Sequence, residues 1–551
     1  MKHLFTIFIL FISINTFGQN RNSQSSITNN SNHYTLYVRF KNNIVNENLQ
    51  LKKTSKLQHI FELNNISIIE NLNINFQKLE KKITSSENKT SLNSLKNIYK
   101  IKIRDKSKED LQRLVKQLES EKDIEYVSLI ENTPIAPPFI RNKSTKTPDL
   151  ESYQSYIESN PGLDFKYAWS IGIAGQNINV LDVEYGFKKS HEMLSNLENV
   201  QLEKDTKLND LLIDSTSAYY NYLDHGTAVS SIMVSSNNKI GLIGSTYKIK
   251  EFTCYLEWTE DGYDRVEAVA SAISDANKGD IIIYEMQTPG ENNNYVTAEY
   301  NKVIWDLTKT ATDAGIIVIA AAGNGNENLD GDYYKEYMNR GNSGAIIVGA
   351  GSNDTTHSRL YFSTYGSRID LQGWGENVVA AGYGDWVKYN NKSNRTYTLF
   401  NGTSSATPLV ASAAALIQSY YFEQTGEYLT PKEMKKLLIE TAIPQGGDIS
   451  KNIGPLPNVK AAIEKLKSSL NITDSTKPLE IKIYPNPVKD YLYIQNISNQ
   501  KLTFDIINFN GVSVSKGSLI NKIDLSKLEK GTYIIKITDG NRLQVEKIIK
   551  I

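Results

Sequence analysis

Ser404 is the first of several residues in this chain whose type and setting could support chemistry. It lies in the segment FNGTSSATPLVASAAALI, directly after Gly402 and Thr403 and at the start of a run of small residues that predicts a helix. At a helix start, backbone N–H groups and the helix dipole favour the negative charge that develops on an attacked carbonyl. A serine in this position can also be a simple N-cap, so the segment alone leaves both interpretations open.

A candidate base occurs in the segment LDHGTAVSSIM. Here His225 precedes Gly226 and Thr227, and the next residues supply the apolar face of a predicted helix: Ala228, Val229, Ile232 and Met233. Three of the six histidines, His3, His33 and His59, lie outside the central region, which leaves His191, His225 and His357. We select His225 because the Gly-Thr turn would hold its ring at a helix N-terminus.

Two further polar residues close predicted buried strands. Asp182 ends the strand in INVLDVEYGF, where a carboxylate is costly to bury unless it is paired. An aspartate that caps a turn is the alternative interpretation. Asn324 follows the strand in IIVIAAAGNGN, and its amide could donate a hydrogen bond to an oxyanion.

The four residues occur in the order Asp, His, Asn, Ser, and the chain order Asp, His, Ser is that of subtilisin. Residues 150–467 therefore resemble the subtilisin-like serine peptidases. The resemblance implies an endopeptidase in which Asp182 orients the imidazole, His225 takes the proton of Ser404, and Ser404 forms an acyl-enzyme. Asn324 and the backbone N–H of Ser404 would form the oxyanion hole. Polypeptides would be the substrates, and the chemistry requires no cofactor.

Several positions depart from the pattern of that family. Where Asp-Thr-Gly or Asp-Ser-Gly is usual, Val183 and Glu184 follow Asp182, and Gly186 is displaced. The substrate-lining segment Ser-Leu-Gly is replaced by residues 285–287, so the usual specificity cannot be transferred. Glu285 would either favour a basic substrate side chain or be a solvated loop charge. These departures support one alternative, a catalytically inactive subtilisin-fold binding protein at the cell surface.

A second enzyme class, the α/β-hydrolase esterases, does not fit the sequence. No G-x-S-x-G motif surrounds Ser404, and the order of the three residues differs from the order in those enzymes.

The elements that would position these residues are short apolar runs alternating with amphipathic helical stretches. We expect strands at 177–182, 280–286, 316–322 and 345–350, and helices that begin near His225, Ser405 and Pro431. Near-continuous apolar runs are typical of strands buried on both faces. The sequence thus predicts an α/β fold, with a subtilisin-like, doubly wound and mostly parallel sheet and helices on both faces.

Residues 34–131 are expected to form a small α+β domain before this sheet. The pattern predicts a strand at 99–103, a helix after the Ser107–Asp110 capping box and a strand at 124–130. The domain resembles the inhibitory propeptides of the same family, so it would act as an intramolecular inhibitor. We expect its cleavage between about Ile130 and Tyr153, around the linker 132–149. A permanently attached substrate-binding domain is the alternative. Residues 1–18 are typical of a signal peptide.

Residues 472–551 show short β-rich segments separated by turn residues, which indicates a small β-sandwich. The segments YPNPVKDYLYI, DIINFNG and GTYIIKI resemble the C-terminal sorting domains of the type IX secretion system. This implies passage through the periplasm to the medium or the outer-membrane surface, with the type IX machinery as partner. An adhesive or carbohydrate-binding sandwich is the alternative.

The composition also limits which classes of partner and site are expected. Lys plus Arg and Asp plus Glu both number 61, so nothing favours a nucleic acid. Cys254 is the single cysteine, which excludes an internal disulfide. No stretch after the signal peptide is long and apolar enough to predict a transmembrane segment in the mature protein. Four residues after Asn324 could ligate structural Ca²⁺, but without EF-hand spacing a polar loop is the simpler interpretation: Asn326, Glu327, Asp330 and Asp332.

Overall fold

The computed structural model describes residues 34–132, 147–470 and 481–551. Short gaps fall at 42–43, 47, 52–54, 73, 84–88, 104–105, 391, 497–501, 520 and 539–542. The predicted signal peptide and most of the predicted linker lie outside the described residues. The chain divides into two compact units, residues 1–462 and 463–551, which are described separately.

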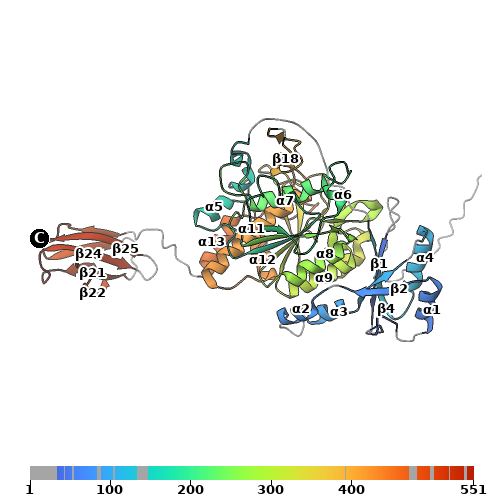
Figure 1. Ribbon diagram of the computed structural model, residues 1–551. Coiled ribbons are helices and arrows are strands. Elements are labelled where there is room, and N and C mark those ends of the chain that lie inside the picture. The colour runs from blue at the N-terminus through green and yellow to red at the C-terminus, as the bar shows by residue number, and fades with distance from the viewer. Residues whose placement is uncertain are drawn as a thin grey trace, which may run out of the picture. The chain divides into compact units, whose positions relative to one another are not determined.

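A seven-stranded parallel sheet is the centre of the first unit (Figure 1). Its strand order is β15-β14-β13-β10-β5-β7-β6, and every neighbouring pair is parallel. The strands are β5 (Asn179–Glu184), β6 (Val200–Leu202), β7 (Glu251–Leu256), β10 (Ile281–Tyr284), β13 (Ile317–Ala321), β14 (Ile346–Gly351) and β15 (Leu371–Trp374). The four predicted strands are confirmed as β5, β10, β13 and β14, and the predicted doubly wound architecture is correct.

Helices cover both faces of this sheet (Figure 1). On one face α7 (Tyr222–Val234) packs against α11 (Thr403–Thr425), which also contacts β10, β13, β14 and β15. On the other face α8 (Arg265–Asp275) contacts β5 and β7, and its neighbour α9 (Lys302–Asp313) contacts β13. The side chains of α7 are buried all round, because the helix lies between the sheet layer and the loops above it.

The remaining elements of this region are short or peripheral. They are α5 (Phe165–Ser170), α6 (Asp210–Ile213), β8 (Trp258–Thr259), β9 (Gly262–Tyr263), β11 (Gln287–Pro289), β12 (Tyr295–Thr297), α10 (Lys335–Asn339), β16 (Val378–Ala381), β17 (Val387–Lys388), β18 (Thr396–Phe400), α12 (Pro431–Glu440) and α13 (Val459–Ser469). The predicted helix starts are confirmed within three residues. None of the described helices is both long and apolar enough to cross a bilayer.

The N-terminal domain is an antiparallel sheet in the order β2-β3-β1-β4. Its elements are β1 (Tyr34–Phe40), α1 (Ser55–Leu63), β2 (Ser67–Asn71), α2 (Phe76–Lys82), α3 (Lys89–Leu95), β3 (Ile98–Lys102), α4 (Lys108–Glu119) and β4 (Ile124–Glu131). The predicted strand, helix and strand at its end are confirmed, and the Ser107 side chain accepts from the Asp110 N–H as the capping box requires. One side of the sheet packs on α1 and α4.

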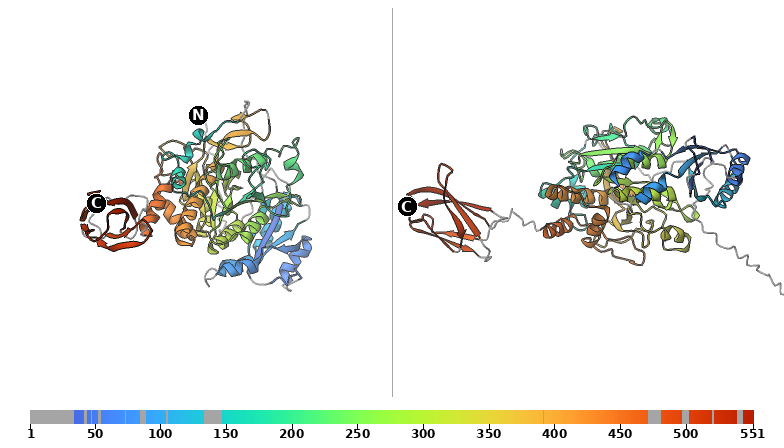
Figure 2. Two further views of the ribbon diagram at one scale, coloured as in Figure 1. Left: turned by 60° about the vertical axis from the view of Figure 1, so that its left-hand side comes forward. Right: turned by 90° about the horizontal axis from the view of Figure 1, so that it is seen from below.

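The C-terminal unit contains two small antiparallel sheets, β19-β20-β23 and β22-β21-β24-β25. Their strands are β19 (Ile481–Tyr484), β20 (Tyr491–Asn496), β21 (Leu502–Ile507), β22 (Ser513–Leu519), β23 (Lys522–Asp524), β24 (Gly531–Thr538) and β25 (Leu543–Lys550). The sheets face one another in Figure 2, and their buried side chains form one apolar core, which confirms the predicted β-sandwich. The sequence did not predict β22 and β23.

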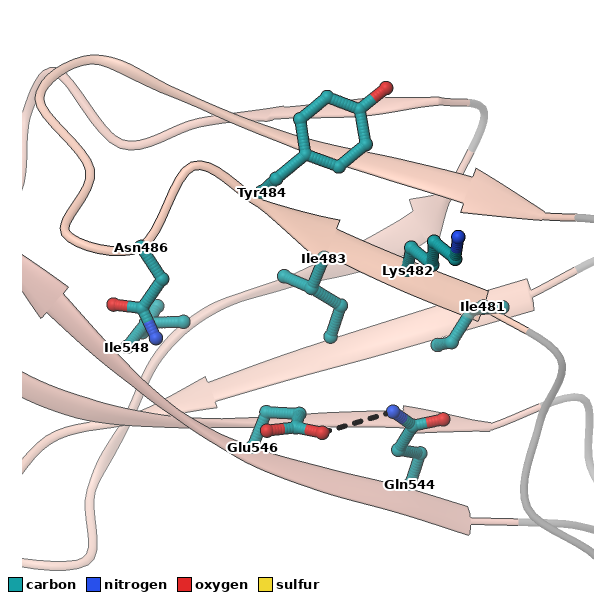
Figure 3. A pocket seen from close by; sticks show the side chains of 8 residues that line it. All are labelled: Ile481, Lys482, Ile483, Tyr484, Asn486, Gln544, Glu546 and Ile548. Carbon is teal, nitrogen blue, oxygen red and sulfur yellow. Dashed lines mark hydrogen bonds between the residues drawn. The ribbon is translucent and has the colours of Figure 1, made fainter.

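The YPNP segment joins the two sheets at one edge of the sandwich. The Asn486 side chain donates to the Lys547 carbonyl at 2.6 Å and accepts from the Ile549 N–H at 2.9 Å. It therefore bonds to one backbone acceptor and one backbone donor of the edge strand β25. Val488, two residues later, is fully buried. An open hollow lies between β19 and β25 beside Asn486 (Figure 3).

Candidate active site

The start of α11 is fixed in place by contacts on both sides of Ser404. Gly402 has φ +105°, a conformation that residues with a Cβ rarely adopt. Its N–H donates to the Gly375 carbonyl at 2.9 Å, and the Ser405 hydroxyl donates to the Trp374 carbonyl at 2.9 Å. Ser404 is therefore held in the first turn of a buried helix beside the end of β15, with 7% of its surface exposed.

Asn324 is bound to the same helix start. Its Oδ1 accepts from the Thr403 N–H at 2.8 Å and from the Thr403 hydroxyl at 3.1 Å. These bonds fix the orientation of the amide and leave Nδ2 as the group that can donate to a further oxygen. Asn324 is therefore bonded to the residue before Ser404, in agreement with their expected proximity.

His225 lies in the first turn of α7, which begins three residues earlier than the sequence indicated, at Tyr222. Its Nδ1 is hydrogen-bonded to Oε2 of Glu184. The ring also meets the Phe400 ring edge-on, with centroids 5.3 Å apart, which places His225 near the strand that leads into the Ser404 segment. The imidazole is 6% exposed, so little water competes for its hydrogen bonds.

The close approach of α7 to the end of β5 depends on Gly226. A Cβ at this position would lie 2.2 Å from the Gly186 carbonyl oxygen and 2.6 Å from Cγ of Glu184. Any larger residue would push His225 away from its acidic partner.

The prediction that Asp182 orients the imidazole is wrong in geometry, because Glu184 occupies that place. Neither carboxyl oxygen of Asp182 has a hydrogen-bond partner among the described residues. Both acids share one face of β5, but residues two apart lie about 6.6 Å apart along a strand, so Asp182 sits deeper in the sheet. Glu184 is the last residue of the strand, and its Oε1 is held by the Tyr185 N–H at 2.8 Å.

A signal for Glu184 was present in the sequence. Counting back from Gly186, which has φ +113°, the acid two positions earlier is Glu184, and this acid-x-Gly spacing is that of the family's aspartate block. Gly186 therefore has the usual spacing from the acid when Glu184, rather than Asp182, is taken as that acid. The prediction failed because residue type was given more weight than spacing.

Four carboxyl groups are buried on neighbouring strands or directly after them: Asp182, Glu184, Glu257 and Glu285. Burial raises the pKa of Asp182 well above its usual range, and the nearby charges of Glu184 and Glu257 add to the effect. Burial also raises the pKa of Glu257, although Arg265, whose guanidinium lies 3.3 Å from its Oε2, opposes the shift. The cluster therefore disfavours full ionisation.

Glu285 follows β10 directly and is 5% exposed, so the interpretation as a solvated loop charge is wrong. Burial raises its pKa well above the usual range, and the charges of Asp182 and Glu184 raise it further. The nearby Ser404 side chain opposes this rise in pKa. Neither oxygen makes a well-formed hydrogen bond to any described residue.

The candidate calcium loop after Asn324 uses its oxygens elsewhere. Asn326 accepts from Arg359 at 3.0 Å, and Glu327 accepts from the Tyr334 hydroxyl at 2.9 Å. The Asp330 carboxylate accepts from the N–H and the hydroxyl of Ser367. These side chains point to separate partners, and the described part of the chain holds no group of three or more His, Cys, Asp or Glu arranged for a metal ion.

The other two histidines of this region have structural surroundings. His191 is fully buried between residues 188–193 and Thr396, and burial lowers its pKa to about 4. His357 contacts the Asn160 side chain at 2.9 Å. Of His191, His225 and His357, only His225 is hydrogen-bonded to an acidic side chain of the described residues.

Comparisons with known proteins agree with this fold. The model of the subtilase family matches residues 173–474, and that of the secretion system C-terminal sorting domain matches residues 482–551. The chain is 26% identical over 285 residues to the major intracellular serine protease of Bacillus subtilis, covering 52% of this chain and 81% of that one. It is also 26% identical over 302 residues to subtilisin DY of Bacillus licheniformis, covering 53% and 93%.

Among solved structures, fervidolysin from Fervidobacterium pennivorans, described as a keratinolytic enzyme related to subtilisin, superposes with a TM-score of 0.52. The alignment covers 93% of this chain and 72% of that one at 16% identity. At this identity the likeness concerns the fold alone.

Proposed function

Because the chain belongs to the subtilase family of serine peptidases, we propose that it hydrolyses peptide bonds through a Glu184, His225 and Ser404 triad. Ser404 is the nucleophile, His225 the general base and Glu184 the acid that orients the imidazole. Asn324 and the backbone N–H of Ser404 form the oxyanion hole. The observation that carries the proposal is the hydrogen bond between His225 Nδ1 and Glu184, since it fixes which ring nitrogen remains for Ser404.

The proposed mechanism follows from this assignment. With Nδ1 engaged by the Glu184 carboxylate, Nε2 takes the hydroxyl proton as Ser404 Oγ attacks the substrate carbonyl carbon. The negative charge moves to the carbonyl oxygen, where Nδ2 of Asn324 and the N–H at the start of α11 stabilise it. His225 then protonates the leaving amine, and water hydrolyses the acyl-enzyme by the reverse sequence of proton transfers.

Glutamate in the place of aspartate adds one methylene to the acid. The second hydrogen bond of Glu184, from the Tyr185 N–H, offsets the added freedom of the longer side chain because it holds the carboxylate at the strand end. This arrangement supports a working acid despite the change of residue type.

Labelling with a serine-directed phosphonate tests the proposal. The full chain should incorporate the reagent at Ser404 and hydrolyse casein, whereas Ser404→Ala should do neither. Loss of the nucleophile in subtilisin lowers kcat by about 10⁶. An unlabelled wild-type chain, or a Ser404→Ala variant with normal turnover, would contradict the assignment.

We further propose that residues 34–131 are an inhibitory propeptide that docks on α8 and α9. The support is a mixed apolar and polar contact with the two helices. Leu79, Leu92 and Leu95 of α2 and α3 are buried in one apolar cluster with side chains of α8 and α9.

Two aspartates of the catalytic domain each accept from two side chains of the N-terminal domain at this face. Asp264, the N-cap of α8, accepts from the Tyr37 hydroxyl and from Lys100 at 2.7 Å. Asp306 in α9 accepts from the buried Tyr126 hydroxyl at 2.9 Å and from Arg39 at 3.2 Å. Since parallel sheets fold slowly, a domain that holds two covering helices together could act as a folding template until cleavage between 132 and 149.

The chain is a secreted or cell-surface protein, as its C-terminal sorting domain indicates. We infer that residues 1–18 direct it to the periplasm and that residues 472–551 are then read by the type IX machinery. Polypeptides outside the cell are the proposed substrates.

A further inference from the structure

We propose that Glu285 is a pH-sensitive regulatory residue of the peptidase: its carboxyl must be uncharged for Ser404 to attack, and its ionisation switches the nucleophile off. The inference rests on the proposed role of Ser404 as the nucleophile. It adds a group that the Glu184, His225 and Ser404 triad does not contain.

The position of Glu285 follows from the sheet. β10 pairs in parallel with β5, with Tyr284 opposite Val183, so Glu285 lies level with the end of β5 where Glu184 reaches His225. Its carboxyl lies beside Ser404 from the side of β10, while His225 belongs to α7. The nucleophile therefore has two titratable neighbours on different elements.

The surroundings of Glu285 are strongly biased against a negative charge. Titratable and charged groups face this region from every element packed around it: Asp182 and Glu184 on β5, Cys254 on β7, Glu257 after β7, Tyr263 on β9, Arg265 on α8 and His225 on α7. Arg265 is engaged by Glu257 and Tyr263, and it also donates to the Gln287 carbonyl at 2.8 Å. No lysine or arginine forms an ion pair with Glu285 among the described residues, and burial holds its pKa well above the usual range.

The protonated form is compatible with catalysis. A carboxylic acid can donate its proton to Ser404 Oγ while the Ser404 hydroxyl donates to His225 Nε2, so each group has one partner. No charge is introduced near the carbonyl oxygen that becomes negative.

The ionised form would inhibit in two ways. A carboxylate only accepts hydrogen bonds, so it would draw the Ser404 hydroxyl proton away from His225. Its charge would also repel the developing oxyanion, and in a buried site this repulsion is weakly screened. Both effects grow as the pH rises through the pKa of Glu285.

The expected pH profile has a definite sign. Activity falls at high pH as Glu285 loses its proton, by about tenfold per pH unit beyond that ionisation. Because the carboxyls of the cluster interact, the falling limb reports an apparent pKa of the group rather than of one residue. The variant Glu285→Gln keeps a neutral side chain at every pH, so it should retain activity and lose the falling limb.

The experiment measures kcat/KM on a peptide substrate and the rate of phosphonate labelling across pH for the full chain after self-processing. Circular dichroism at each pH shows whether the fold persists, since a merely structural role would change the spectrum as well as the rate. Asp182→Asn is the matched control, because it neutralises another buried carboxyl of the cluster whose oxygens bond no described residue, and it should keep the falling limb. Glu285→Met, apolar and of similar length, replaces Glu285→Gln if that variant does not fold.

The two proposals fail in different ways. A wild-type chain that is neither labelled nor active at any pH contradicts the role of Ser404. A wild-type chain that is labelled and active but has no falling limb overturns the role of Glu285 alone. A falling limb that persists in Glu285→Gln or Glu285→Met overturns it equally.

Discussion

His225 Nδ1 is hydrogen-bonded to Glu184 and not to Asp182, although both acids point from the same face of β5. The two acids therefore offset the cost of their burial in different ways. Glu184 ends the strand and is stabilised by the imidazole and by the Tyr185 N–H. Asp182 lies one pleat deeper, where no described residue is a hydrogen-bond partner, so its burial is tolerated only in the neutral form that its raised pKa favours.

The first prediction concerns these two acids. Glu184→Gln should lower kcat by about 10⁴, as loss of the triad aspartate does in subtilisin, because the imidazolium loses its counter-charge. Glu184→Asp should fall between the wild type and Glu184→Gln, since the shorter side chain stops short of the ring. Steady-state kinetics on a peptide substrate measure both.

Asp182→Asn is the control for this series. The amide replaces a neutral carboxyl of the same shape, so kcat should stay within about tenfold of the wild type. A loss as large as that of Glu184→Gln would instead return the role of the acid to Asp182.

Much of the central fold could be predicted because its strands are continuous apolar runs, which only a sheet covered on both faces can bury. The tail strands β22 and β23 were missed since SVSKGSL and KID carry few apolar side chains and are held mainly by pairing with β21 and β20. Helices α2 and α3 were missed for a related reason. Their leucines become buried only through contact with α8 and α9, which lie far away in the sequence.

The site residues could be predicted where the order of residue types and the ends of predicted elements identify them. His225, Asn324 and Ser404 were found because each follows a turn signal at the end of an element. Glu285 was misplaced because a residue just after a strand was taken as exposed, whereas it is buried behind β10, a strand that lies between β5 and β13 and contacts α11. Its burial depends on three elements that the local sequence does not describe.

A second prediction concerns His191 and acid stability. The folded state holds this ring neutral, since its Nδ1 accepts from the Met193 N–H at 3.2 Å and burial lowers its pKa to about 4. The unfolded chain takes up a proton near the ordinary pKa of about 6.5, so this contribution is fully present above that pH and is lost progressively toward pH 4. The free energy of unfolding should therefore fall as the pH drops from 6.5 to 4.

Urea unfolding of the Ser404→Ala chain at pH 7 and pH 4.5 measures this loss without self-digestion. In the same background His191→Gln, whose amide can make similar hydrogen bonds without titrating, should show a smaller difference between the two pH values. An equal difference in both chains would assign the pH dependence to other groups.

The third prediction concerns the contact between the N-terminal domain and α9. Tyr126→Phe removes one of the hydrogen bonds to the buried Asp306 carboxylate, and a hydrogen bond to a charged group contributes about 1.5–3 kcal/mol. Active enzyme should appear more slowly after expression, while kcat of the processed enzyme should not change. A time course of activity and of the cleaved product measures both quantities.

Arg113→Ala provides the control for this contact. Its guanidinium pairs only within α4, with the exposed carboxylate of Asp110, so maturation should proceed as in the wild type. Equal slowing by both variants would show that general destabilisation of the domain, rather than the contact with Asp306, sets the rate.

The last prediction concerns the C-terminal unit, where Asn486 binds the main chain of β25 through both halves of its amide. Asn486→Ala removes both bonds and should destabilise the edge of the sandwich by about 1 kcal/mol, because the site is exposed to water. If the secretion machinery reads the folded edge, more of the chain should remain in the periplasm and less should reach the medium. Asn510→Ala, in an exposed turn of β21 and β22, is the matched control and should be exported normally. Normal export of Asn486→Ala, with the sandwich destabilised as expected, would show that recognition depends on other residues of the tail.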